Sequence, residues 1–347
     1  DKACTPEKTL ETVKKRLAAL PYSILSETRR IDNGRLGIPV YLSICGEEAK
    51  RHMPTRKQMG KGASPAQAEA SALMELMERY GFFTFWDNLP GVVRATWYEA
   101  EDLFGESLMP VSEVIKACHD NITDDAGRRI MNLRSWLFFP SVRVSDGKTV
   151  YVPLDLFKQL GEFNGSSAGN TDVESIFQGA CELVERHVSC IADRERPRMF
   201  GIDLSPESLQ DPVLVKLVDC FRKEGIALVL KDFSMTMPVP TVAALAWDPA
   251  TFPDSSEIVF TAGTAASPVK AAVRAITEVA QLAGDFNSNA CYEASGLPKF
   301  ASLEEAAWLL SGPSRNLREL PDLDSDDMLD ELGGLAESLE AQGFTLY

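Results

Sequence analysis

Two segments of the chain repeat one set of polar residues at one helical spacing. Each set holds a serine or glutamine, two glutamates and an arginine at positions i, i+4, i+7 and i+8; the sets are Ser71, Glu75, Glu78 and Arg79, and Gln178, Glu182, Glu185 and Arg186. At about 100° per residue, each set lies within an arc of about 100° on one helix face. A single stripe of this kind is typical of a solvated face, but its repetition indicates a common site.

Glutamates that come together from two helices repel one another unless cations lie between them. Mg²⁺ is the simplest such cation, because it prefers oxygen ligands and bridges carboxylates to phosphate oxygens. The arginine, glutamine and serine members would then contact and orient the phosphates. The repeated stripe therefore predicts a site for Mg²⁺ and a polyphosphate.

Two loops before these segments offer contacts for an anion. Gly60-Lys61-Gly62 combines close backbone approach with a positive charge, although the GxxxxGK[ST] pattern of a Walker A loop is absent. Small residues at 164–171 precede the second segment, and they fit a ligand-contact surface at a helix N-terminus and an ordinary capped turn equally well. A third, looser repeat has Arg274, Glu278 and Gln281.

The elements that must position these residues follow from the apolar pattern and the turn residues. We expect long helices at 64–86, 171–193 and 268–283, and further helices at 5–20, 302–310 and 325–341. Strands are expected near 40–45, 226–229, 241–246, 258–261 and 344–347, with a hairpin of 137–144 and 149–152 around Asp146-Gly147. These elements predict an α+β fold with mixed sheets and several long helices.

Composition narrows the class of protein. The chain has 347 residues, of which 45% are hydrophobic and 25% charged, as is typical of a folded globular protein. Its net charge of −16 argues against a nucleic-acid partner, which needs a basic surface. It has no apolar run long enough to span a membrane and no signal peptide, so we expect a cytoplasmic protein. Neither disulfides nor a zinc site is expected, because the seven cysteines form no CxxC pair and Cys118-His119 has no companion ligands.

The chain resembles the YcaO family. Three signatures of that family, SxxxExxER, SxxNxxxE and QxxxExxER, occur complete and in order, and the middle one is Ser167-x2-Asn170-x3-Glu174. Further similarity lies at 37–40, 60–62, 152–153, 231–233 and 274–281. The resemblance implies one YcaO-type catalytic domain over 1–347, with about 30–347 covered and 1–29 as a helix and strand extension. It also implies that the chain stops where the family continues with a strand.

This resemblance implies an ATP-dependent enzyme that activates a peptide backbone amide, with ATP and Mg²⁺ as cofactors. The implied fold has mixed or antiparallel sheets flanked by long helices, with a pseudo-duplicated pair of ATP-binding helices. In this family a nucleophile adds to the amide carbonyl, ATP phosphorylates the resulting oxygen, and phosphate leaves. A side-chain nucleophile yields an azoline, sulfide yields a thioamide, and an amine yields an amidine.

The resemblance also assigns roles by position. It implies that Glu75, Glu78, Glu182 and Glu185 are the magnesium ligands. The phosphates should face Lys61, Arg79, Arg186 and Arg274, of which Arg186 and Arg274 are the catalytic candidates. The nucleoside and the remaining polar contacts should fall to Ser71, Ser167, Asn170, Glu174 and Gln178. One departure is Ala283, which stands where the family often has an arginine.

Three functions remain open at this level. The first is thioamide formation with a sulfur donor and a partner such as a TfuA-type protein. The second is an azoline-forming cyclodehydratase, and the third is a nucleotide-binding accessory protein without amide chemistry. The first 30 residues are too short for a winged-helix recognition domain. We therefore expect a peptide or protein substrate recognised with the help of a separate leader-binding partner, and a homodimer is compatible with this reading.

Overall fold

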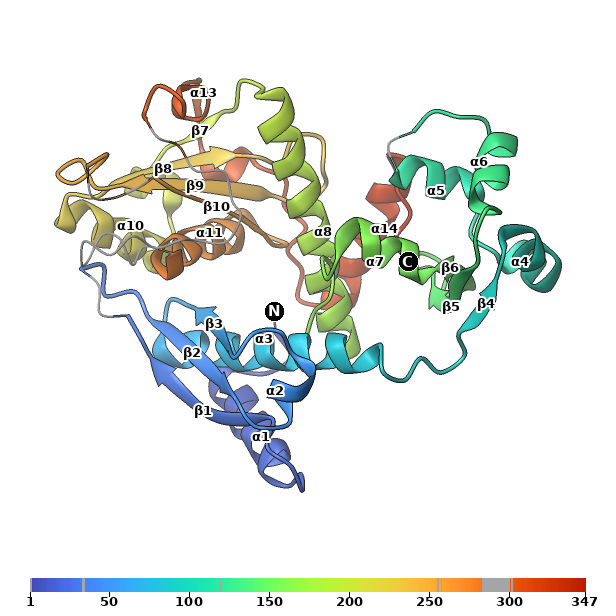
Figure 1. Ribbon diagram of the computed structural model, residues 1–347. Helices are drawn as coiled ribbons and strands as arrows, with labels where there is room; N and C mark the ends of the chain where they lie inside the picture. Colours follow the sequence, from blue (N-terminus) through green and yellow to red (C-terminus); the bar gives the residue numbers. More distant parts are fainter. Residues whose placement is uncertain are drawn as a thin grey trace. The chain divides into compact units, whose positions relative to one another are not determined.

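The computed structural model describes residues 2–32, 35–118, 120–254, 256, 258–282, 300 and 302–347. The chain forms two compact units, one of Asp1–Phe83 with Gly165–Leu335 and the other of Thr84–Asn164 with Ala336–Tyr347. Both combine helices with antiparallel or mixed sheets (Figure 1), which confirms the predicted fold class. Every predicted site residue lies in the first unit.

The first unit begins with a three-stranded antiparallel sheet in the order β1-β2-β3. Its strands are β1 (Leu25–Arg30), β2 (Val40–Cys45) and β3 (Lys57–Lys61), and its helices are α1 (Pro6–Ala18), α2 (Ala49–His52) and α3 (Pro65–Phe85). Gly60 allows β3 to touch α3, because a Cβ there would lie 1.9 Å from the Ala72 nitrogen. The Ser43 hydroxyl also donates to the Ala72 carbonyl at 2.7 Å. These contacts hold Lys61 beside the first stripe.

The larger sheet of this unit has the order β10-β9-β8-β7-β11. Its strands are β7 (Gly201–Ile202), β8 (Ala227–Asp232), β9 (Thr241–Trp247), β10 (Val259–Thr264) and β11 (Ser314–Arg315). Apolar residues of α10 (Pro212–Glu224) and α11 (Pro268–Leu282) pack against the sheet in one core that includes Phe221, Leu230, Val242 and Ile276 (Figure 1). Gly263 brings β10 against α11, where a Cβ would lie 2.6 Å from the Ala271 oxygen.

The second stripe lies on α8 (Asp172–Glu195), which begins after the N-cap Thr171. The Thr171 hydroxyl accepts from the Glu174 N–H, so the predicted capped turn is present. Among the described residues, the unit also has the helices α9 (Pro206–Leu209), α13 (Ala307–Leu310) and α14 (Met328–Ala341) and the 3₁₀ turn η2 (Leu317–Glu319). Helix α14 continues into the second unit.

The second unit is built on the sheet β4-β5-β6. Its elements are β4 (Val93–Ala95), α4 (Trp97–Phe104), η1 (Gly105–Ser107), α5 (Val111–Ala117), α6 (Asp124–Met131), β5 (Trp136–Val142), β6 (Thr149–Pro153) and α7 (Leu154–Gly161). Trp97 and Phe138 are fully buried in its core. The predicted hairpin is confirmed, and Gly147 adopts a positive φ of 69° in its turn.

Two predicted elements are wrong. A helix was expected at 302–310, but only Ala307–Leu310 is helical, and turns precede it. A strand was expected at 344–347, but the segment is irregular. A single backbone hydrogen bond, from the Val144 N–H to the Leu346 oxygen at 2.9 Å, is too little to form a strand pair.

Some sequence expectations fall outside the described residues, namely those on His119, Ala283 and Cys291. The six cysteines that the structure describes are free thiols. Among the helices of the described ranges, none combines the length and apolar character that crossing a bilayer would require.

Candidate active site

The two glutamate stripes face a common charged region inside the first unit. Burial raises the pKa of Glu75, and the neighbouring carboxylates Glu278 and Glu182 raise it further, whereas Lys61 and Arg79 oppose them. Glu75 lies on α3, Glu182 on α8 and Glu278 on α11. Carboxylates from three helices are therefore near enough for their charges to interact.

Glu78 is the second carboxylate of the α3 stripe. Burial raises the pKa of Glu78 to about 7, and the charges of Glu182 and Glu75 add to this effect. The Arg79 guanidinium lies 3.4 Å from the Glu78 carboxylate and opposes the shift, as does a 3.4 Å hydrogen bond from the Ser166 hydroxyl. A carboxyl group that keeps its proton up to neutral pH has too little positive charge nearby to stabilise its ionised form.

Glu185 is the most deeply buried member of the α8 stripe and is only 8% exposed. Its Oε2 accepts from the backbone N–H of Thr264, at the end of β10, at 3.0 Å. Burial raises the pKa of the Glu185 carboxyl, and the nearby charge of Glu278 acts in the same direction. The hydrogen bond fixes this carboxylate between α8 and the larger sheet.

The α11 repeat also contributes to the region. The Lys61 ammonium lies 2.5 Å from Glu278, which joins β3 to α11. Arg274 donates from one terminal nitrogen to the Gln178 side-chain oxygen at 2.6 Å. The Nε of Arg274 is buried and has no hydrogen-bond partner among the described residues. A buried guanidinium N–H left in this way suits an anionic group such as a phosphate.

The remaining stripe residues lie at the edge of this region. Arg186 is 3.5 Å from Glu182, one turn earlier on α8, and its side chain is about half exposed. Ser71 is half-buried and makes no hydrogen bond with any residue that the structure describes. The structure therefore leaves Ser71 and Arg186 accessible beside the partly buried carboxylates.

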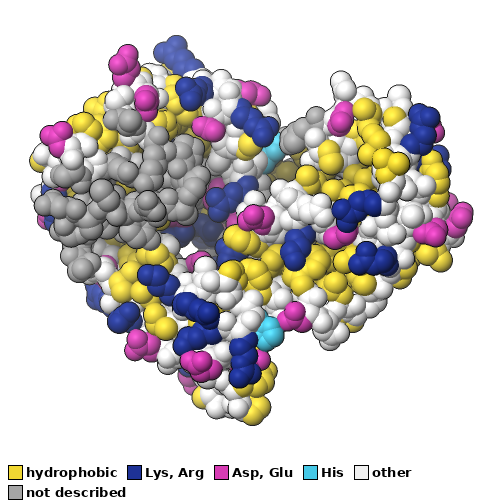
Figure 2. Space-filling view, in the orientation of Figure 1, with side chains coloured by type: hydrophobic (Ala, Val, Ile, Leu, Met, Phe, Trp, Pro, Cys, Tyr) yellow, Lys and Arg dark blue, Asp and Glu magenta, His cyan; other side chains and the backbone are white. Residues whose placement is uncertain are grey.

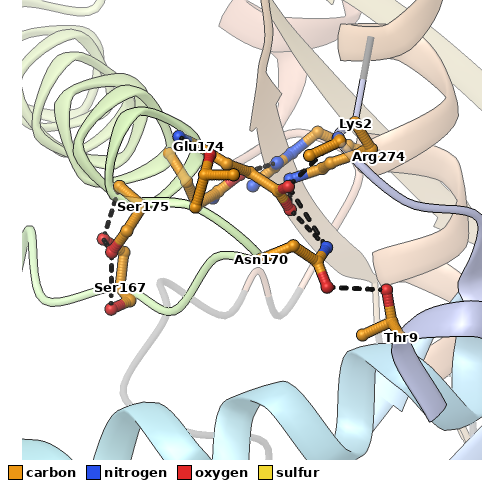
Figure 3. A network of polar contacts seen from close by, with 10 residues as sticks. Lys2, Thr9, Ser167, Asn170, Glu174, Ser175 and Arg274 are labelled. Carbon is orange, nitrogen blue, oxygen red and sulfur yellow. Dashed lines mark hydrogen bonds and ion pairs between the residues drawn. The ribbon is translucent and has the colours of Figure 1, made fainter. Parts of the chain in front are cut away.

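The SxxNxxxE residues form a polar network with the N-terminal segment (Figure 3). Glu174, which is 4% exposed, accepts hydrogen bonds from the Asn170 amide at 3.2 Å and the Ala3 N–H at 3.3 Å. The Lys2 ammonium lies 3.2 Å from the same carboxylate. The Asn170 oxygen accepts from the Thr9 hydroxyl at 2.9 Å. The N-terminal segment and α1 therefore contact the SxxNxxxE residues directly.

Ser167 has a local role in the same network. Its hydroxyl donates to the Ser175 carbonyl at 2.6 Å, and the Ser175 hydroxyl donates back to the Ser167 carbonyl at 3.0 Å (Figure 3). Gly169 and Gly179 allow this close packing, because a Cβ on either would lie within 2.5 Å of a backbone atom. The loop is thus folded tightly onto the start of α8.

Sequence reasoning did not identify three residues of this region as site residues. Glu278 had a signal, since it follows Arg274 by four residues in the looser repeat. Lys2 and Thr9 had none, because no spacing connects them to residues far along the chain. Thr9 is nevertheless the residue of α1 that is buried, and its hydroxyl donates to Asn170.

The donor set fits Mg²⁺ bound together with phosphate groups. Within the described ranges, no three His, Cys, Asp or Glu side chains are gathered so that they could hold a metal ion by themselves. Mg²⁺ usually takes one or two carboxylates and completes its shell with waters and phosphate oxygens. The raised pKa values of Glu75 and Glu78 and the unpaired Nε of Arg274 match a site that gains both a cation and an anion.

Comparisons with known proteins identify proteins that are similar to this chain in sequence and in structure. A family model described as YcaO cyclodehydratase, ATP- and Mg²⁺-binding, matches residues 59–347. The Escherichia coli ribosomal protein S12 methylthiotransferase accessory factor YcaO is 30% identical over 217 residues, which are 55% of this chain and 35% of that protein. An uncharacterized protein in the tfuA 3′ region of Rhizobium leguminosarum bv. trifolii is 25% identical over 99% of this chain and 82% of its own length.

Two solved structures share the fold. A heterocyclase in complex with substrate and cofactor matches with a TM-score of 0.77 and 22% identity, over 99% of this chain and 49% of that chain. YcaO from Methanopyrus kandleri, bound with AMPPCP and Mg²⁺, matches with a TM-score of 0.68 and 21% identity. The match covers 99% of this chain and 85% of that chain. The chain thus spans about half of the heterocyclase and a third of the E. coli relative. Since the family model covers most of its length, the chain belongs to the YcaO family of ATP-dependent enzymes, with ATP and Mg²⁺ as its cofactors.

Proposed function

We propose that this protein uses ATP and Mg²⁺ to activate a peptide backbone amide by phosphorylating its oxygen. The observation that carries the proposal is the meeting of partly buried carboxylates from α3, α8 and α11 near Lys61 and Arg274. An amide oxygen is a poor leaving group, and phosphorylation makes it a good one. The energy barrier of phosphoryl transfer is lowered chiefly by positive charge placed around the phosphates.

In this proposal the metal is held by the glutamates that the structure brings together. Glu75, Glu78 and Glu182 serve as magnesium ligands together with Glu278, and bound Mg²⁺ offsets the negative charge of the phosphate oxygens. Glu185, whose carboxylate already accepts from Thr264, has one oxygen left for the metal and is fixed in direction by that hydrogen bond.

We propose that positively charged side chains contact the phosphates. Arg274 offers its buried Nε while Gln178 holds the terminal nitrogen, so the guanidinium is positioned before the ligand binds. Lys61 and Arg79 provide further positive charge at the α3 side. Arg186 is half exposed at the rim, where it can turn from Glu182 toward a phosphate. We assign Arg186 and Arg274 the catalytic role of stabilising the transferred group.

The nucleoside side of the site is proposed to include the network of Figure 3. The proposed nucleoside residues are Ser71, Ser167, Asn170, Glu174 and Gln178, to which we add Lys2 and Thr9. Figure 3 shows Ser167, Asn170 and Glu174 together with Lys2 and Thr9. Asn170 and Glu174 are held between α8 and the N-terminal segment, so that segment forms part of the binding site. Lys2, which pairs with Glu174, can also reach a ligand because its side chain is about half exposed.

For the product we propose a thioamide, formed when a sulfur donor supplies the nucleophile. The Rhizobium relative from the tfuA 3′ region supports this choice and a TfuA-type partner. Azoline formation is the second candidate, and it is favoured by the description of the family model and by the heterocyclase likeness. Both products require the same activated amide, so the site residues do not depend on the choice.

The mass change of the peptide distinguishes a thioamide product from an azoline product. The protein is incubated with Mg²⁺, ATP, sulfide and a panel of candidate peptides that contain cysteine. We expect ATP-dependent phosphate release together with a peptide mass gain of about 16 Da, for exchange of oxygen by sulfur. A loss of about 18 Da would instead establish cyclodehydration. ATP binding without phosphate release or a mass change, with the natural peptide present, would favour the accessory-protein alternative.

Magnesium binding should depend on pH near neutrality. Burial raises the pKa of Glu78 to about 7 and also raises the pKa values of Glu75 and Glu185. At lower pH these groups must lose protons before they bind a cation, so the affinity for Mg²⁺ falls by up to about tenfold per pH unit for each proton displaced. Thermal-shift titrations with MgCl₂ at a constant ATP concentration at pH 6, 7 and 8 measure this dependence. Equal affinities at pH 6 and 8 would contradict the assignment.

A further inference from the structure

The N-terminal part of this acidic chain is basic. Residues 1–61 contain 13 Lys and Arg against 7 Asp and Glu, whereas the whole chain has 35 against 51. These residues form α1, α2 and the sheet β1-β2-β3. Figure 2 shows Lys and Arg side chains gathered on the lower left of the molecule, where Figure 1 places these elements. Such a surface attracts an acidic partner.

Strand β1 forms one edge of that sheet, since its only ladder partner within the described ranges is β2. In an antiparallel pair, alternate residues of β1 bond their backbone N–H and C=O groups to β2. The residues between them therefore present their N–H and C=O groups at the outer edge of β1. No described residue makes a backbone hydrogen bond with that edge of Ser26–Arg30. The side chains of Ser26, Glu27, Arg29 and Arg30 are exposed. An extended chain could therefore add to the sheet here.

An apolar depression lies where β1 begins. It has a volume of about 450 Å³ and is lined mostly by apolar side chains of the end of α1 and the residues before β1, including Leu17, Leu20, Tyr22, Ile24 and Leu25. Leu20 and Tyr22 are exposed at 37% and 45%, while Ile24 forms a buried floor at 3%. The volume is sufficient for one bulky side chain. Because Leu25 both lines the depression and begins β1, the two features are continuous.

Unpaired positive charge flanks this edge. Arg29 on β1 and Lys15 and Arg16 on α1 form no ion pair with any residue in the described ranges. Lys14 and Arg30, by contrast, are paired with Glu69 and Asp32. The edge thus has positive charge available for a ligand of opposite charge.

The strand register connects this edge to the candidate active site. Arg30 pairs with Tyr41, and Tyr41 pairs with Gly60, so the last residue of β1 is level with Gly60 and Lys61. Two strand spacings separate them, or about 10 Å. A chain added outside β1 lies one further spacing away, about 14 Å from β3, and needs about four more residues to reach the level of Lys61.

From these observations we propose that β1 and the adjoining depression bind an acidic, extended segment of the peptide substrate, which adds as a strand with one apolar side chain in the depression. The inference rests on the proposed function, in which the substrate is a peptide. It further specifies that the apolar anchor lies about 10 residues from the modified amide, because the path runs along six residues of β1 and then across the sheet.

Peptide binding without nucleotide tests this proposal apart from the chemistry. The probe is a fluorescein-labelled ten-residue peptide of alternating Glu and Thr with one central Phe, titrated with the full chain and followed by anisotropy. We expect saturable binding that weakens at least about tenfold with Leu20→Glu and with Arg29→Glu. Replacing the peptide's Phe by Ser, or its Glu by Lys, should weaken binding similarly. Hydrogen exchange at 25–30 should slow when the peptide binds.

The matched control is Leu133→Glu, which places the same charge on a leucine that is 83% exposed in the second unit. It should bind the peptide as the unchanged chain does. Calorimetry should show that Leu20→Glu still binds Mg·ATP, so that a failure of the nucleotide site is recognised separately. The proposal is overturned if the peptide does not bind at millimolar concentration, or if all three variants bind it equally. It is also overturned if peptide-free protein dimerises with β1 already protected, because a second copy then occupies the edge.

Discussion

Glu75→Gln should lower the affinity for Mg·ATP by at least about 100-fold while leaving the protein equally or more stable. The amide keeps the shape of the side chain but removes the charge that the metal needs. The pKa of Glu75 is raised by burial and by Glu278 and Glu182, which means that the folded state disfavours its charged form. Removing that charge at pH 8 therefore relieves the folded state. Calorimetry with ATP and excess Mg²⁺ measures the first effect, and thermal unfolding measures the second.

Glu182→Gln should reproduce this result from the other helix. Glu195→Gln is the matched control, since Glu195 is an exposed residue of the same helix α8 outside the stripe. The control should bind Mg·ATP with unchanged affinity. If Glu75→Gln and Glu182→Gln also bind Mg·ATP as tightly as the unchanged chain, the two stripes do not form a common metal site.

Gly60→Ala should destabilise the fold by about 3 kcal/mol or more. A Cβ at this position would lie 1.9 Å from the Ala72 nitrogen and 2.4 Å from the Ala68 oxygen, both of which are backbone atoms of α3. Backbone in a helix cannot rotate away as a side chain can, so β3 must separate from α3. Lys61 follows Gly60 directly, and for this reason nucleotide affinity should fall together with stability. Urea unfolding followed by circular dichroism measures the loss.

Gly333→Ala is the control for this substitution. Gly333 lies inside α14, and nothing lies within 4 Å of where its Cβ would be. Alanine favours a helix over glycine, so we expect a gain of up to about 1 kcal/mol. A Gly60→Ala protein as stable as the unchanged chain would show that β3 and α3 are not held as closely as described.

The helices that carry the stripes could be predicted from the sequence because helical periodicity is local. Ser64-Pro65 starts the first, and α3 indeed begins at Pro65. The predicted start of the second at Thr171 matches the N-cap of α8. The helices of the second unit between residues 97 and 131 were not predicted. Short helices form mainly through packing, and α4 is held by Trp97 in the core with Phe138, which is distant in the sequence.

The sequence by itself determined the two glutamate stripes, their spacing and the family to which the chain belongs, because these depend on residue types at short separations. Only the tertiary structure decided that Glu278 joins the carboxylates, that Lys2 and Thr9 reach the SxxNxxxE motif, and that Glu185 is held by the Thr264 backbone. The physical reason is that contacts between distant segments follow from how helices pack on sheets. At Gly60 and Gly263 that packing depends on the absence of a single carbon atom.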